Sequence, residues 1–138
     1  MIVIDTNILV HLTIESELTA SARELVREHE VHAPRFWRSE YMNVLATQIR
    51  HKSLPLADAL SLVVRCQSLI NGNEHETDSK SVLSLAQGSG CTSYDCEFVA
   101  TAVDLGVPLV TLDKRLLSAF PEVARSLESM VGEGSQAP

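Results

Sequence analysis

Residues 2–7 read Ile2-Val3-Ile4-Asp5-Thr6-Asn7, three β-branched residues followed at once by an aspartate. β-Branched residues favour strands, and a short uncharged run of them is typical of a buried strand. Thr6 and Asn7 are residue types that begin helices, and the apolar residues after them recur at helical spacing. The stretch therefore predicts a strand, a sharp turn and a helix, with Asp5 at the carboxyl end of the strand.

The same order recurs in the last third of the chain. Residues 94–105 predict a helix, Gly106 suits its C-terminal cap, and residues 108–112 predict a short buried strand. Asp113 then precedes a short predicted helix over 114–120. Two predicted strands thus each end in an aspartate.

Helices and one further strand occupy the middle of the chain. The spacing of apolar residues predicts helices over 18–29, 36–49, 55–70 and 79–86, a strand over 31–34, and polar loops over 71–78 and 88–90. Short apolar strands separated by helices favour an α/β fold with a short central parallel sheet flanked by helices. Ligand sites of such folds lie at the carboxyl ends of the strands. We expect one domain over residues 1–131 and a disordered polar tail over 132–138.

Composition narrows the class of protein. The chain has 138 residues, of which 45% are hydrophobic, enough for one core without disulfides or a structural metal. Its three cysteines, Cys66, Cys91 and Cys96, lack a C-x-x-C pair, which argues against a disulfide framework and a thiolate zinc site and favours core positions. No apolar run is long enough for a membrane helix, and the start is acidic where a signal peptide is basic. We expect a soluble cytoplasmic protein that uses no membrane.

The net charge is −7, which argues against tight non-specific binding to duplex nucleic acid. Residues 31–65 are locally basic, with five Lys or Arg against two acids. The histidines are scattered, and we expect surface or capping positions for all five: His11, His29, His32, His51 and His75.

Two acidic residues in the first third have both a functional and a structural interpretation. Asp5 stands where α/β sheets hold ligands, but it is equally suited to cap the following helix. Glu40 shares a helix face with apolar residues, where a lone charge needs a partner or a metal. The alternative for Glu40 is an ion pair with Arg35 or Arg38.

Two more acidic residues lie in the last third. Asp95 is expected to point along the apolar face of its helix, whereas Glu97 and Asp104 are expected to point elsewhere. A capping box with Thr92 explains Asp95 equally well, and Asp113 could simply cap the next helix. Each alternative is sound alone, but four such carboxylates together favour a shared site.

Clustered carboxylates need a cation to neutralise them. Mg²⁺ and Mn²⁺ accept oxygen ligands alone, and the absence of paired His or Cys residues argues against zinc. Thr6, Asn7 and Thr111 are candidates for orienting the carboxylates by hydrogen bonds, although turn and capping roles explain these residues equally well. The residues therefore predict a magnesium or manganese site.

Four blocks of sequence resemble one family. They are Val3-Ile4-Asp5-Thr6-Asn7, Ser39-Glu40, residues 94–100 (Tyr94-Asp95-Cys96-Glu97-Phe98-Val99-Ala100) and residues 109–115 (Leu109-Val110-Thr111-Leu112-Asp113-Lys114-Arg115). In this order they resemble PIN-domain ribonucleases, and most of all the VapC-type toxins of toxin–antitoxin pairs. The resemblance covers residues 1 to about 120 and implies a PIN-like three-layer fold. PIN domains usually end with a further short strand, whereas Phe120–Met130 predicts a helix or an irregular segment here.

The resemblance also implies chemistry and partners. It implies RNA as substrate, homodimers, a protein antitoxin that blocks the site, and Mg²⁺ or Mn²⁺ held by the acids matching Asp5, Glu40, Asp95 and Asp113. We expect Asp5 and Asp95 to be direct ligands, Asp113 to bind directly or through water, and Glu40 to orient the attacking water.

Substrate contacts are predicted more loosely. Arg35, Arg38, Lys114 and Arg115 could meet phosphates at the mouth of the site, although each could also be an ordinary surface base. Six aromatic residues are too few for a base-stacking platform, which favours recognition of RNA shape and backbone. The amphipathic helices over 55–70 and 79–86 could form a groove for an antitoxin helix.

Other functions fit less well. A receiver domain needs an acidic pair after the first strand, and a haloacid-dehalogenase phosphatase needs an aspartate where Asn7 stands. A PIN-like module that binds RNA or protein without cleaving it, and a housekeeping RNA-processing nuclease, remain open alternatives.

Overall fold

Five short parallel strands form the centre of the fold, in the order β3-β2-β1-β4-β5. The computed structural model describes residues 1–135. The strands are β1 (Ile2–Ile4), β2 (Val31–Pro34), β3 (Glu74–His75), β4 (Leu109–Thr111) and β5 (Ala124–Ser126). In the middle of the sheet Val3 pairs with His32 on one side and with Leu109 on the other. The predicted parallel sheet is confirmed.

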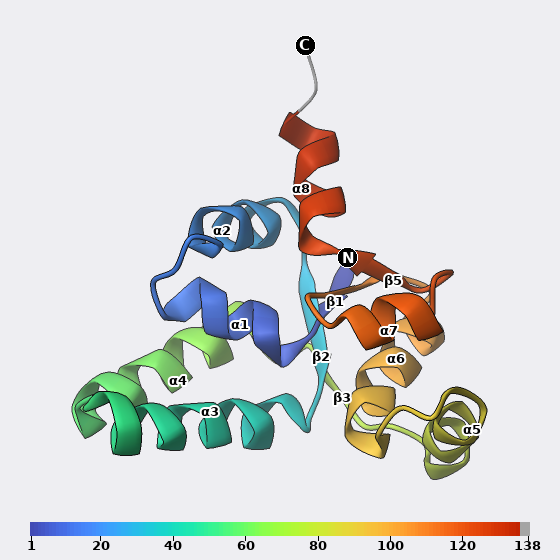
Figure 1. Ribbon diagram of the computed structural model, residues 1–138, viewed down its shortest axis with the longest axis horizontal. Helices are drawn as coiled ribbons and strands as arrows, with labels where there is room; N and C mark the ends of the chain where they lie inside the picture. The colour runs from blue at the N-terminus through green and yellow to red at the C-terminus, as the bar shows by residue number, and fades with distance from the viewer. Residues whose placement is uncertain (136–138) are drawn as a thin grey trace.

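Helices cover both faces of this sheet. They are α1 (Thr6–Thr13), α2 (Thr19–Glu28), α3 (Trp37–Lys52), α4 (Leu56–Ile70), α5 (Ser79–Ser89), α6 (Ser93–Leu105), α7 (Lys114–Ala119) and α8 (Leu127–Ser135). Figure 1 shows α1 to α4 on one side of the sheet and α5 to α7 on the other, while α8 projects beyond it. The predicted three-layer α/β architecture is therefore confirmed. No helix within the described residues is long and apolar enough to cross a membrane.

The core surrounds the middle strands. All residues of β1 and β4 are buried, because helices cover both faces of the sheet there. Ile8 and Leu9 pack on it from α1, and Phe98 and Val99 from α6. The three cysteines are buried and unpaired, as their pattern predicted.

Two glycines end helices as left-handed caps. Gly106 follows α6 with φ of 68°, as predicted. Gly90 follows α5 with φ of 74°, so this helix continues past its predicted end at Ala86 and includes Gly88 and Ser89. The Ser89 hydroxyl donates a hydrogen bond to the Leu85 carbonyl at 2.7 Å and supports the extra turn.

Both edge strands differ from the prediction. β3 lies within a segment predicted as a polar loop, and β5 lies where no strand was expected. Neither contains an apolar run, and each is held by pairing with a neighbour, Ala33 with Glu74 and Thr111 with Ser126. The closing strand of the sheet is therefore present. α8 includes residues 132–135 of the predicted tail, and residues 136–138 lie outside the described part of the chain.

His32 is also a correction, because it is buried in β2 rather than exposed. Its Nδ1 lies 2.8 Å from Nε2 of His75, and its Nε2 lies 2.6 Å from a carboxylate oxygen of Glu30. The two imidazole rings stack with centroids 5.0 Å apart. Both ring nitrogens of His32 thus have hydrogen-bond partners, so burial leaves no polar atom of the ring unsatisfied.

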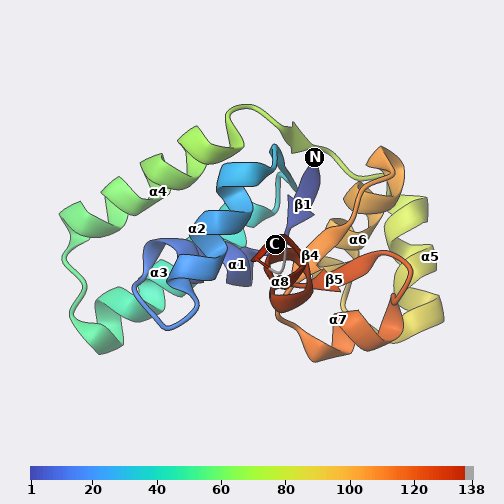
Figure 2. The same cartoon turned by 90° about the horizontal axis from the view of Figure 1, so that it is seen from above.

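The groove predicted between the helices over 55–70 and 79–86, which are α4 and α5, is not formed. α4 and α5 lie at opposite ends of the molecule in both Figure 1 and Figure 2. α4 exposes Leu56, Leu60 and Val64, and α5 exposes Leu83. These apolar side chains therefore belong to two separate surfaces.

Candidate active site

Asp5 and Asp113 lie at the carboxyl edge of the sheet, where each follows one of the neighbouring strands β1 and β4 in the chain. Asp5 is 5% exposed, and its Oδ1 caps α1 by accepting from the Thr6 backbone at 2.8 Å. Asp113 caps α7 in the same way, accepting from the Arg115 backbone at 2.8 Å. The capping interpretation is thus correct for both residues. It explains one oxygen of each carboxylate.

Thr111 connects the two aspartates. Its hydroxyl donates to Oδ2 of Asp5 at 2.8 Å and accepts from the Asp113 backbone at 3.0 Å. The Asn7 amide group donates to the same Asp5 oxygen at 3.4 Å, while its carbonyl accepts from the Leu112 backbone at 3.3 Å. Thr6, Asn7 and Thr111 therefore lie around the acids, and Thr111 and Asn7 fix the rotamer of Asp5.

Glu40 and Asp95 reach the same place from α3 and α6. Their charges both act on Asp5 and contribute to the rise in its pKa. The Thr92 hydroxyl accepts from the Asp95 backbone at 3.1 Å, so the predicted cap at the start of α6 is present. This cap fixes the first turn of α6 and leaves the Asp95 carboxylate near the other acids.

Burial and mutual repulsion make this cluster hard to ionise. Burial raises the pKa of Asp5 to about 7, despite the hydrogen bond from Thr111, and the charge of Glu40 adds to the rise. Burial likewise raises the pKa of Glu40 and of Asp95, and the charge of Asp113 adds to the rise for Asp95. Among residues 1–135 the charge of Arg115 offsets only part of the cost of ionising these acids.

One prediction concerns the metal-free protein. Its free energy of unfolding should fall as the pH rises from about 4 to about 7. Asp5 ionises near its ordinary pKa of 3.8 when unfolded and at about 7 when folded, so the folded state binds more protons across this window. The contribution of Asp5 is on the order of 4 kcal/mol, since one pKa unit corresponds to about 1.4 kcal/mol. Urea unfolding in EDTA at a series of pH values measures it.

Asp5→Asn is the control for this prediction, because it keeps the shape of the side chain and cannot ionise. The variant should lose most of the decline and should be more stable than the wild type above pH 7. Parallel pH profiles for the two proteins would show that Asp5 is not the titrating group.

The carboxylate oxygen Oε1 of Glu40 is buried without a hydrogen-bond partner. The hydroxyl oxygen of Thr6 is also buried without one. The Thr6 hydroxyl lies near enough to offset part of the rise in the pKa of Glu40, but the two do not form a hydrogen bond. The alternative pairing of Glu40 with Arg35 or Arg38 is not seen among the described ion pairs, since Arg35 lies 3.6 Å from Glu76 instead. A buried carboxylate oxygen without a partner is suited to bind a cation or a water molecule.

Glu97 is a fifth acid at the cluster, and the sequence analysis had placed it on another face. Its carboxylate accepts a hydrogen bond from the Thr77 hydroxyl at 2.7 Å, and its charge contributes to the rise in the pKa of Glu40. Asp95 and Glu97, two residues apart on α6, thus both act on Glu40. Helical spacing relative to Asp95 gave no sign of this.

The donor set fits a divalent cation. Within residues 1–135 no group of three or more His, Cys, Asp or Glu side chains is arranged so that it could hold a metal ion as it stands. The unpartnered oxygen of Glu40 and the raised pKa values of Asp5 and Asp95 nevertheless indicate uncompensated negative charge among oxygen ligands. Mg²⁺ and Mn²⁺ prefer such ligands and would supply the missing positive charge.

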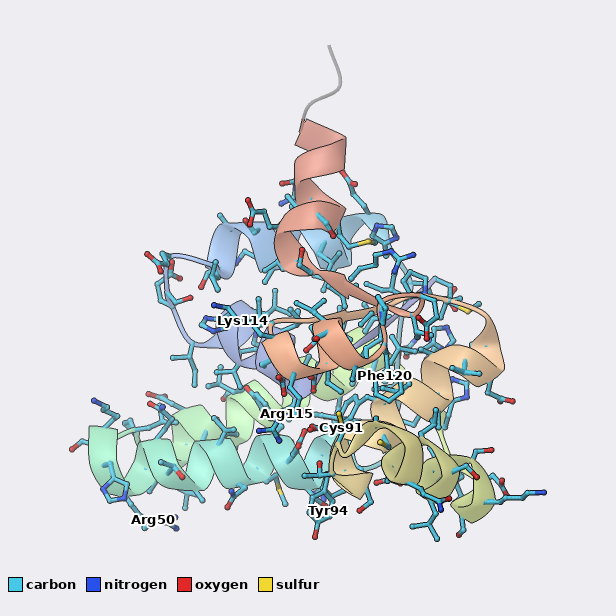
Figure 3. All side chains as sticks on the ribbon, turned by 45° about the vertical axis from the view of Figure 1, so that its right-hand side comes forward. Arg50, Cys91, Tyr94, Lys114, Arg115 and Phe120 are labelled. Carbon is cyan, nitrogen blue, oxygen red and sulfur yellow. The ribbon has the colours of Figure 1, made fainter. Side chains whose placement is uncertain are left out.

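The predicted substrate-binding bases differ in position. Arg115 lies near Asp95, where its charge partly offsets the raised pKa of that carboxyl group. Figure 3 shows Arg115 beside the N-terminal end of α3, with Arg50 at the far end of that helix. Arg35 and Arg38 are exposed before and at the start of α3.

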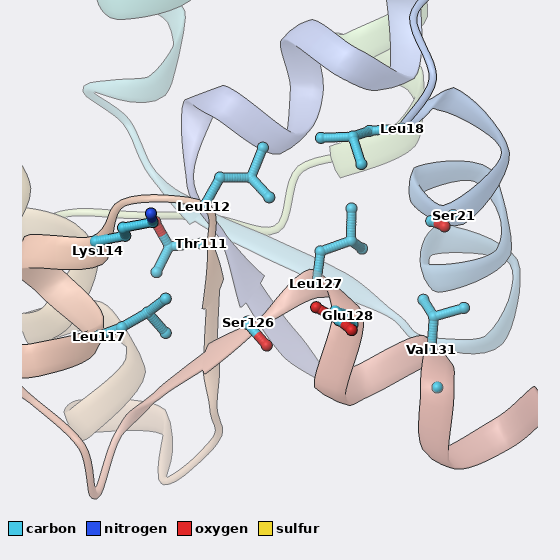
Figure 4. A pocket seen from close by; sticks show the side chains of 11 residues that line it. Leu18, Ser21, Thr111, Leu112, Lys114, Leu117, Ser126, Leu127, Glu128 and Val131 are labelled. Carbon is cyan, nitrogen blue, oxygen red and sulfur yellow. The ribbon is translucent and has the colours of Figure 1, made fainter. Parts of the chain in front are cut away.

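Lys114 lines a separate hollow of about 480 Å³ between α2, α7 and α8. Figure 4 shows Lys114 beside Thr111 at its edge, with Leu18, Leu127 and Val131 around the interior. The hollow is mainly apolar and contains none of the four predicted acids. It adjoins the acidic cluster through Thr111 and differs from it in chemistry.

Comparison with known proteins agrees with this geometry. The model of the PIN domain family matches residues 2–125, a span that includes all five acids. The chain belongs to the PIN domain family. Its fold is similar to the crystal structure of PAE2754 from Pyrobaculum aerophilum, with a TM-score of 0.78 and 21% sequence identity, over 99% of this chain and 90% of that one. A search of curated proteins gave no match.

PIN domains are generally metal-dependent nucleases, so family membership and the acidic edge of the sheet indicate the same class of chemistry. The family match over residues 2–125 includes the four blocks of sequence that carry the resemblance. In this PIN domain those blocks lie at the ends of β1 and β4 and in the first turns of α3 and α6.

Proposed function

We propose that this PIN domain is an endoribonuclease that uses Mg²⁺ or Mn²⁺ to hydrolyse RNA phosphodiester bonds, and that it acts as the toxin of a toxin–antitoxin pair. The observation that supports the nuclease best is the meeting of Asp5, Glu40, Asp95 and Asp113 at one edge of the sheet. Carboxylates alone repel a phosphodiester, so their clustering is useful for this reaction only with a cation.

Asp5 and Asp95 would hold the metal, and Asp113 would bind it directly or through water. A divalent ion held by these residues would neutralise the phosphate and would make a nearby water a better nucleophile. Thr111 and Asn7 keep the Asp5 carboxylate in one orientation, so the donor atoms are arranged before substrate arrives.

Glu40 is suited to orient and deprotonate the attacking water. Its buried Oε1 has a free lone pair, and burial raises its pKa, which favours a group that accepts a proton. The water oxygen bonds to phosphorus as the bond to the 3′-oxygen breaks, and the 3′-oxygen leaves with a proton from solvent. Arg115, near Asp95, would contact a phosphate oxygen of the bound strand.

The products should have 5′-phosphate and 3′-hydroxyl ends, because water rather than the 2′-hydroxyl attacks phosphorus. A short single-stranded RNA with Mn²⁺, followed by mass spectrometry of the fragments, tests this. A 2′-deoxy substitution at the cleaved nucleotide should leave cutting intact, and Glu40→Gln should stop it. Fragments ending in a 2′,3′-cyclic phosphate would contradict the proposed reaction.

The toxin role requires an antitoxin, and we propose a protein partner and a homodimer. The exposed apolar side chains Leu56, Leu60 and Val64 form a stripe along α4 that supports a protein contact. An antitoxin that places an arginine among the acids would compete with the metal ion for the same carboxylates.

A further inference from the structure

Two aromatic rings stack at the acidic cluster. Phe36 and Tyr94 have ring centroids 5.0 Å apart and planes inclined by 11°. Tyr94 is 57% exposed, whereas Phe36 is half-buried behind it. Stacking on Phe36 therefore fixes the Tyr94 ring and leaves much of its surface open to solvent.

This exposure is unusual for the chain. It has one tryptophan, two tyrosines and three phenylalanines, and the remaining four of these aromatics are buried: Trp37, Tyr41, Phe98 and Phe120. The fold thus buries every aromatic side chain except the pair beside the site. Phe36 and Tyr94 are therefore the aromatic side chains that a ligand at the site could reach.

The backbone ties this pair to the proposed chemistry. Tyr94 directly precedes Asp95 in the first turn of α6, and the Phe36 carbonyl accepts from the Glu40 backbone at 3.2 Å. Two bases belong to the same surroundings, since Arg35 directly precedes Phe36 in the chain and the charge of Arg115 acts on Asp95. Figure 3 shows Tyr94 and Arg115 close to the same end of α3. The exposed ring therefore belongs to the residue next to Asp95, and its partner Phe36 lies one helical turn before Glu40.

We propose that Tyr94, backed by Phe36, stacks on the base of the unpaired nucleotide next to the cleaved phosphate. The inference rests on the proposed nuclease function and adds a residue that contacts the substrate. Every base has a flat π-face, so one ring provides affinity without sequence readout. Bases within a duplex are already stacked and paired and cannot reach the ring. Six aromatic residues are too few for a stacking platform, but two suffice for one base.

Binding to a short single-stranded RNA with one 2-aminopurine tests the contact, with Asp5→Asn as background so that the strand stays intact. Tyr94→Ala should weaken binding about tenfold and remove the fluorescence quenching that stacking causes. Tyr94→Phe should keep both, and Tyr94→Leu, which is apolar without a ring, should lose both. The dependence of affinity on salt should not change, since the ring releases no counterions.

Arg50→Ala is the control, because Arg50 is exposed at the opposite end of α3. It should bind like the parent. Equal binding and quenching by Tyr94→Ala and the parent would overturn the inference, and that result would be expected if the ring instead contacts a partner protein. Equal behaviour of the Leu and Phe variants would overturn it as well, since apolar bulk would then suffice.

Kinetics separate this inference from the proposed function. With Asp5 intact, Tyr94→Ala should raise KM for the single strand about tenfold and leave kcat nearly unchanged. If the wild type cuts RNA and Tyr94→Ala cuts it with the same KM, the stacking role fails and the nuclease stands. If no RNA is cut but quenching still depends on Tyr94, the nuclease fails and the base contact stands.

Discussion

Asp5→Asn should reduce RNA cleavage on the order of a thousandfold while the protein stays folded. Asp5 is the most buried of the four predicted acids, and both of its oxygens already have fixed partners, Thr6 and Thr111. Asparagine keeps nearly the same shape, but it is neutral and offers one ligand oxygen in place of two. Initial rates on a short single-stranded RNA at saturating Mn²⁺ measure the loss.

The matched control is Asp58→Asn, the same chemical change at an exposed aspartate in the first turn of α4. It should retain the wild-type rate. Circular dichroism and the unfolding midpoint show whether Asp5→Asn has kept its fold. If a folded Asp5→Asn variant cuts RNA at the wild-type rate, Asp5 is not part of the catalytic site.

Much of the site could be predicted from the sequence, because local patterns determine where strands end. The uncharged runs before Asp5 and before Asp113 fix the two central strands, and parallel strands bring their carboxyl ends to one edge. Glu40 was recognisable because a charge on an apolar helix face needs an explanation. Its lack of an ion pair with Arg35 or Arg38 could be learned only from the packed structure.

The remaining features depend on tertiary contacts that leave no periodic signal. β3 and β5 are polar and very short, and only pairing with β2 and β4 makes them strands. His32 is buried because Glu30 and His75 happen to lie beside its ring nitrogens. The stacking of Phe36 on Tyr94 joins residues far apart in the chain, which spacing along one helix cannot indicate.

Loss of the metal should have an effect as large as loss of Asp5. Without a cation the ionised acids repel the phosphate, and burial, together with the charge of Asp95, raises the pKa of Glu40. Addition of Mn²⁺ to the metal-free protein should also raise its unfolding midpoint, since the folded state binds the ion and the unfolded chain does not. In Asp5→Asn this stabilisation should be much smaller.

The rate of RNA cleavage as a function of free Mn²⁺, starting from protein stripped with EDTA, tests most directly the claim that this acidic edge is a metal-dependent nuclease site. We predict no cleavage in EDTA, a rate that rises and saturates as Mn²⁺ is added, and the same behaviour with Mg²⁺. Cleavage at full rate in EDTA, with the protein verified to be free of metal, would contradict the account.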